Sequence, residues 1–155
     1  MASNEDSLPG FPKKSNKQII KTMENIVVNY VPMIGAAGYF AFLSNVMNPN
    51  LLNHVSPEYK LALANSLLFT SNMGIGLYLY NSKHLALCQK PAERIAYTLL
   101  GTVMFNFGSI LLCATSRVVM PEEPYTRFIA GAILGAGFLY FGRKYVLYLD
   151  NSKDF

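Results

Sequence analysis

Long uncharged stretches alternate with short charged ones along this chain. No Asp, Glu, Lys or Arg occurs within residues 25–57, 61–82, 95–116 or 128–142. A membrane-spanning helix needs about 20 mostly apolar residues, and three of these stretches meet that length. The fourth is shorter, but the long side chains of Arg143 and Lys144 can reach the membrane surface from within a helix that continues past them. The sequence therefore predicts four spans, near 26–46, 60–80, 95–116 and 126–147.

Composition supports a membrane protein over the alternative of a soluble helical bundle. The chain is 52% hydrophobic and 14% charged, whereas a soluble domain is about a quarter charged. Helices of a soluble bundle also need a polar outer face, which these segments lack. We expect an all-α fold, a bundle of four transmembrane helices, with residues 19–149 as one membrane domain. A polar arm (1–18) precedes it and a short polar tail (150–155) follows it.

Basic residues are unevenly divided between the two sides that four spans would define. The side with both termini and the loop near 81–94 carries Lys13, Lys14, Lys17, Lys21, Lys83, Lys90, Arg94, Arg143, Lys144 and Lys153. The other side carries Lys60, Arg117 and Arg127. Loops rich in Lys and Arg stay on the cytosolic or matrix side, so we expect both termini there. The net charge of +4 mostly reflects this asymmetry, and no basic face for nucleic acid is visible.

Glycine spacing predicts how the helices pack. Within membranes, small residues four apart allow two backbones to approach closely. We expect helix-packing contacts at Gly76, Gly101, Gly108, Gly131, Gly135 and Gly142. Because the second and third predicted spans have small faces of their own, Gly131 and Gly135 should meet one of them. The aromatic side of the last span would then face lipid or a neighbouring subunit, through Phe138, Tyr140 and Phe141.

The interiors of the predicted spans carry no ionisable side chain. Catalytic and transport sites inside membranes usually use such groups, so we expect no catalytic residue, no metal and no cofactor. His54 and His84 fall on opposite predicted sides and cannot share a metal. Asn65 and Asn72 of the second predicted span either hydrogen-bond to a neighbouring helix or, together with Asn106 of the third, line a polar path.

Basic residues at the predicted matrix or cytosolic surface form a candidate site for lipid headgroups. They are Lys83, Lys90, Arg94, Arg143 and Lys144. Clusters of this kind attract anionic phospholipids, for example cardiolipin. The alternative is a solvated basic loop that only sets the orientation.

Four short patterns resemble a known family. They are Ile34-Gly-Ala-Ala-Gly-Tyr, Ala62-Leu-Ala-Asn65, Gly101-x6-Gly108-Ser-Ile-Leu-Leu and a glycine-rich span between Pro124 and Gly142. Together they resemble the transmembrane protein 256 family, small four-span proteins of mitochondria and bacterial inner membranes without established chemistry. That family tends to carry histidines after its first span and early in its second. This chain has Phe42-Leu-Ser-Asn45 and Ser66 to Asn72 there, so any role of those histidines is not carried over.

These observations lead us to expect a non-catalytic accessory subunit of a larger membrane assembly, in contact with lipids and other membrane subunits. The resemblance implies a respiratory-chain complex or supercomplex of the mitochondrial inner membrane; the endoplasmic reticulum or another cell membrane is the alternative location. A small solute carrier, channel or lipid-binding protein is the second class. The third is a membrane-associated glutathione or eicosanoid enzyme, but the charged pattern of those enzymes is missing around Asn65.

Overall fold

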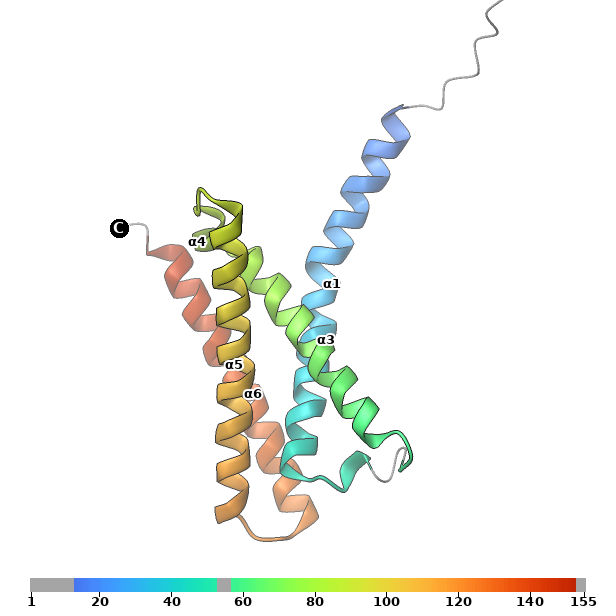
Figure 1. Ribbon diagram of the computed structural model, residues 1–155, viewed down its shortest axis with the longest axis vertical. Helices are drawn as coiled ribbons and strands as arrows, with labels where there is room; N and C mark the ends of the chain where they lie inside the picture. The colour runs from blue at the N-terminus through green and yellow to red at the C-terminus, as the bar shows by residue number, and fades with distance from the viewer. Residues whose placement is uncertain (1–12, 53–56, 153–155) are drawn as a thin grey trace, which may run out of the picture.

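The computed structural model describes residues 13–52 and 57–152, and no strand occurs among them. The helices are α1 (Lys13–Met47), α3 (Lys60–Tyr80), α4 (Lys83–Ala86), α5 (Pro91–Val119) and α6 (Pro124–Asn151). Figure 1 shows the four long helices gathered in a bundle, beyond which the first half of α1 projects. The all-α prediction is therefore confirmed for the described residues.

Each predicted span lies within one long helix, but the helices extend further than the spans. α1 already begins at Lys13, inside the predicted polar arm, and continues through Pro32 without a break. α6 reaches Asn151, inside the predicted tail. Prolines at the first position start α5 and α6, because their fixed φ suits the first turn and their missing N–H is not needed there. The short α4 was not predicted, and residues 1–12 of the arm lie outside the described residues.

Two of the long helices are apolar enough and long enough to cross a membrane. They are the segment Gln18–Met47 of α1 and the whole of α5, Pro91–Val119, each with a mean hydropathy of 1.7. Asn65 and Asn72 make α3 less apolar, and charged side chains do the same in α6. Four spans therefore remain a prediction, while two membrane-length helices are a property of the structure.

Helix α1 occupies the central position in the bundle. It packs most extensively against α3 and next against α6, whereas α5 packs mainly against α3 and only sparsely against α6. The start of α1, the short α4 and the end of α6 lie at one end of the bundle (Figure 1). We call this the open end. The opposite end, where α1 finishes and α6 starts, is the closed end.

The hydrophobic core lies towards the closed end. Its fully buried members are Tyr39, Leu43 and Met47 of α1 together with Cys113 of α5. Partly buried side chains from α3 and α6 surround them. The core is small because the chain has few apolar residues that face inward.

The glycines of α6 meet α1, and the prediction that Gly131 and Gly135 face α3 or α5 is wrong. A methyl group on Gly131 would lie 3.0 Å from Met47 Cγ, and one on Gly135 would lie 3.6 Å from Leu43 Cδ1. The reason is the order of the helices. Because α1 occupies the centre of the bundle, the small face of α6 meets α1 before it can reach α3.

The other predicted packing glycines divide into those with a neighbour and one without. Methyl groups on Gly76, Gly101 and Gly142 would contact Thr102 at 3.4 Å, Leu79 at 3.2 Å and Phe105 at 2.8 Å, respectively. Gly108 has nothing within 4 Å, so its predicted packing role is not found among the residues that the structure describes. It lies on the exposed side of α5, where neither α3 nor α6 reaches it.

The closest contact between two helices is one that the sequence analysis did not single out. Gly35 of α1 and Gly74 of α3 lie backbone to backbone, and a Cβ on either residue would overlap the Cα of the other. A Cβ on Gly74 would also lie 3.0 Å from the Val31 carbonyl oxygen. Glycine at both positions is what allows α1 and α3 to cross here.

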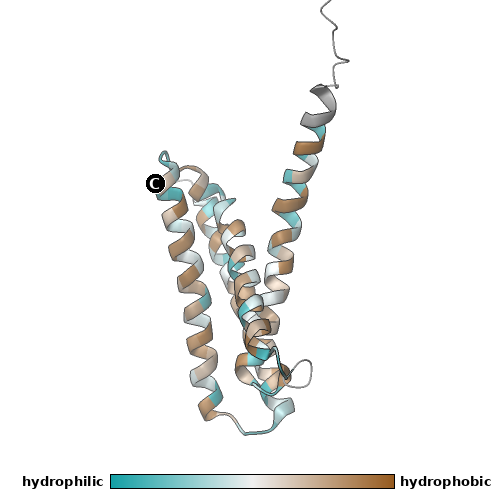
Figure 2. Cartoon of the chain, turned by 45° about the vertical axis from the view of Figure 1, so that its right-hand side comes forward, coloured by the Kyte–Doolittle hydropathy of each residue, from teal (hydrophilic) through white to brown (hydrophobic). Residues whose placement is uncertain are grey.

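Helix α5 is polar on its inner face and apolar on its outer face. Its buried residues are Thr98, Thr102, Asn106, Ser109 and Cys113. Its exposed large side chains include Leu99, Val103, Met104, Phe107 and Leu111. Figure 2 shows hydrophobic residues along the full length of the long helices. Exposure of this apolar outer face to water would be unfavourable. Hydrocarbon around the bundle would cover it.

Candidate functional site

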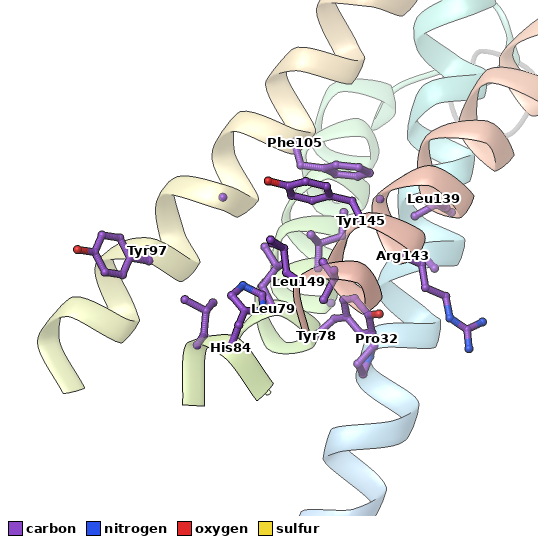
Figure 3. Close-up of a pocket in the computed structure, with 17 residues that line it drawn as sticks. Pro32, Tyr78, Leu79, His84, Tyr97, Phe105, Leu139, Arg143, Tyr145 and Leu149 are labelled. Carbon is purple, nitrogen blue, oxygen red and sulfur yellow. The ribbon is translucent and has the colours of Figure 1, made fainter. Parts of the chain in front are cut away.

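A pocket of about 470 Å³ lies at the open end, where residues of α1, α3, α4, α5 and α6 surround it (Figure 3). Its volume falls within the range of roughly 300–1,000 Å³ that is typical of ligand sites. Most of its lining is aliphatic or aromatic, and the basic side chains in the lining are His84 and Arg143. Such a lining suits an apolar ligand with a polar or anionic end.

The pocket ends at Phe105, whose ring separates it from the core. This ring packs against Tyr39, with 5.4 Å between ring centroids. On its other side it meets Gly142 so closely that a methyl group there would lie 2.8 Å from Phe105 Cε2. Phe105 is therefore held between α1 and α6, and it forms the floor of the pocket.

One wall of the pocket is the short helix α4, which is tied to the end of α6. The His84 backbone N–H donates to Asp150 Oδ1 at 2.9 Å, and His84 Nδ1 lies 2.8 Å from the same oxygen. Partial desolvation would raise the pKa of Asp150, but hydrogen bonds from the His84 amide, the His84 ring and the Lys83 amide outweigh it and lower that pKa. The tie brings buried Leu85 into the pocket lining.

Sequence reasoning missed this tie. His84 was considered as a possible metal ligand, and Asp150 was assigned to the polar tail. The two residues are 66 positions apart, and nothing local to either one indicates the other. His54, the other histidine, lies outside the described residues.

Two of the five residues expected to contact lipid headgroups have partners within the chain. Arg94 lies 3.9 Å above the centroid of the Tyr80 ring, and its Nε donates to the Tyr80 carbonyl oxygen at 3.2 Å. It thus satisfies a carbonyl that the end of α3 leaves without a helical partner. Lys90 forms an exposed pair with Glu93 at 3.1 Å, which contributes little to stability.

The other three, Lys83, Arg143 and Lys144, are exposed. Their side chains make no hydrogen bond or ion pair with any other residue that the structure describes. Only Arg143 of these three also lines the pocket. Figure 3 shows it at the edge of the pocket with its guanidinium group pointing outward. The structure therefore places, beside an apolar pocket, a positive charge that has no partner among the described residues.

Asn72 of α3 and Asn106 of α5 hydrogen-bond to each other rather than line a path through the bundle. Asn106 is fully buried; its Nδ2 donates to Asn72 Oδ1 at 2.8 Å, and Ser71 Oγ donates to Asn106 Oδ1 at 2.9 Å. Of the two alternatives for Asn72, the structure therefore shows the hydrogen bond to a neighbouring helix. Asn65 is exposed on α3 and takes no part in this network.

Comparison of the chain with protein-family models, with curated proteins and with solved structures gave no match. Within residues 13–52 and 57–152, no group of three His, Cys, Asp or Glu side chains is arranged to hold a metal ion. Any functional argument therefore depends on the pocket, on the unpaired charges beside it and on the surfaces that the helices expose.

Proposed function

We propose that this chain is a multi-pass membrane protein that serves as a non-catalytic accessory subunit of a larger membrane assembly. The observation that carries this proposal is the state of the first half of α1. Every residue from Gln18 to Tyr30 is exposed, whereas all buried residues of α1 lie between Gly35 and Met47. In Figure 1 this half leaves the bundle and has no neighbour among the described helices.

The projecting half of α1 has one apolar face. With 100° per residue, Ile19, Met23, Ile26 and Tyr30 fall within an arc of about 60°, and all four are exposed. Lys21 lies on the opposite side of the helix. An apolar stripe of this kind is stable when another apolar surface covers it.

The length of α1 favours a protein as that cover. α3 crosses α1 at Gly74 and ends six residues later at Tyr80, about 9 Å beyond the crossing. The same distance along α1 from Gly35 reaches only to about Asn29. α3, with 21 residues, matches the hydrocarbon core of roughly 30 Å, so its end marks the edge of that core. Most of the apolar stripe precedes Asn29 on α1 and therefore lies beyond the bilayer core. A partner subunit at the membrane surface would cover it.

Site-specific photo-crosslinking tests this proposal. A photoreactive amino acid at Met23 should form a discrete protein adduct in native membranes, and the same group at Lys21 should not. The adduct should comigrate with a large complex on native gels after extraction in mild detergent. If the chain migrates alone and Met23 labels only lipid, the subunit proposal is wrong.

We further propose that both termini face the matrix and that the assembly belongs to the respiratory chain of the mitochondrial inner membrane. The support is the excess of basic residues at the open end and the resemblance to the transmembrane protein 256 family. Cell fractionation with protease protection of tags at each terminus tests location and orientation together. A different membrane would overturn the location without affecting the crosslinking result.

A further inference from the structure

We infer that the pocket at the open end binds one acyl chain of an anionic phospholipid from the surrounding bilayer, with the lipid phosphate at Arg143. This inference uses the proposed placement in a membrane but not the proposed role as a subunit. Three features of the pocket support this ligand: the apolar lining, Arg143 at the rim and Phe105 at the floor.

The lining suits a hydrocarbon chain. Side chains of α3 and α6 provide most of it, including Ile75, Leu79, Leu139, Val146 and Leu149. In a bilayer, however, such a surface gains little from one lipid tail over another, because the surrounding tails are equally apolar. A preference for one lipid must therefore come from its headgroup.

The rim supplies a headgroup contact in Arg143. A guanidinium group binds phosphate through two parallel hydrogen bonds, and the side chain of Arg143 has no partner among the described residues. Asp150, the other charged residue near the end of α6, is hydrogen-bonded to His84 and forms no ion pair with Arg143. The rim also carries Tyr145, a residue type that settles at the level of lipid headgroups.

The floor argues against the pocket as the entrance of a solute path. Phe105 lines the pocket and packs against the core, and the side chains of Asn72 and Asn106, which do not line the pocket, are hydrogen-bonded to each other. A small anion could pair with Arg143, since His84 is already hydrogen-bonded to Asp150, but it would gain nothing from the apolar lining. A phospholipid uses both, and the leaflet on the basic side is its continuous source.

Tryptophan fluorescence can report the bound chain, because the protein contains no tryptophan. Full-length protein with Tyr145→Trp is placed in phosphatidylcholine nanodiscs that contain small fractions of lipid with brominated acyl chains. The matched control is Tyr140→Trp, which is on the same helix and equally exposed (62% against 64%) but does not line the pocket. Brominated phosphatidylglycerol should quench Tyr145→Trp at about fivefold lower fractions than brominated phosphatidylcholine, while the control shows no preference.

Two pairs of variants then separate the headgroup contact from the apolar pocket. In the Tyr145→Trp protein, Arg143→Gln should abolish the fivefold preference, and the adjacent Lys144→Gln should keep it. Leu149→Phe, which fills the pocket, should remove the preferential quenching, and the outward-facing Leu147→Phe should not.

Three results would overturn the inference. Equal effects of Arg143→Gln and Lys144→Gln would show that only general surface charge matters. Displacement of the brominated phospholipid by lower fractions of free oleate would make a fatty acid the ligand. Absence of quenching of Tyr140→Trp by either lipid would mean that the membrane placement itself is wrong, a failure distinct from loss of the preference alone.

Discussion

At the closed end of the bundle, Tyr39, Leu43 and Met47 of α1 are almost completely buried, and α6 approaches them through Gly131. At the open end the same helices surround a pocket of about 470 Å³. The closed end is held by contact between backbones and a small core. The open end is held by side-chain ties such as the one between His84 and Asp150.

The boundary between these regions is the crossing of Gly35 and Gly74. On one side of it α1 stays among the other helices, and on the other side it leaves them (Figure 1). Once α1 has diverged, the remaining space is bounded by α4 and by side chains from α6. The packing is therefore concentrated in one half of the bundle, and the other half encloses the pocket.

The largest effect is expected from Gly74→Ala at the crossing itself. The added methyl group would overlap the backbone of Gly35, so the helices must separate, at a cost of about 1–3 kcal/mol or more. Gly108→Ala is the control, because nothing lies within 4 Å of Gly108; it should gain up to about 1 kcal/mol from helix propensity. Thermal unfolding in detergent, followed by circular dichroism, measures both. Equal stability of the two variants would remove the structural basis of the boundary.

The next effect concerns the polar network just on the closed side of that boundary. Asn106→Leu leaves the amide oxygen of Asn72 and the hydroxyl of Ser71 without their partner, and it should lower the free energy of unfolding by about 0.6–2 kcal/mol. Asn65→Leu, on the exposed side of α3, should have almost no effect. The same detergent unfolding assay compares them. A destabilising Asn65→Leu would indicate that the exposed side of α3 also makes polar contacts.

A smaller effect is expected at the floor of the pocket. Gly142→Ala pushes on the ring of Phe105, which cannot retreat freely because it packs against Tyr39; the cost should be roughly 1 kcal/mol. The displaced ring should also reduce lipid quenching of the Tyr145→Trp reporter. Gly137→Ala, with nothing within 4 Å, should leave the quenching unchanged and, like Gly108→Ala, gain up to about 1 kcal/mol from helix propensity. Unchanged quenching in both variants would show that Phe105 does not limit the pocket.

The smallest effect is a pH dependence confined to the open end. Because the folded pKa of Asp150 is lowered, its tie to α4 is fully present above the ordinary aspartate value of about 3.9. The tie is lost as the pH falls through the folded pKa. Hydrogen exchange at the His84 amide, corrected for its intrinsic pH dependence, should therefore rise below about pH 4. Asp150→Asn should remove that step, whereas Glu93→Gln in the exposed pair with Lys90 should preserve it.

The sequence by itself determined the four long helices, because the signals for helices are local, but it did not indicate the short α4 or the start of α1 at Lys13. Uncharged stretches, prolines at the first positions of α5 and α6, and charged residues between helices all act on their own segment of chain. Of the two interpretations offered for Asn72, the contact with a neighbouring helix is the one observed, because a buried amide needs a partner wherever it lies; Asn65, in contrast, is exposed. The resemblance to a family, and the assembly it implies, remain predictions.

Only the tertiary structure decided which faces meet. Whether Gly131 packs on α1 or α3 depends on the order and rotation of whole helices, which the spacing of glycines does not contain. For the same reason Gly108 was given a neighbour that it does not have, and the Gly35–Gly74 contact was overlooked. The pocket is the clearest case, because its lining comes from residues between Pro32 and Leu149. These residues form one site only because α1 diverges from the other helices and α4 is hydrogen-bonded to the end of α6.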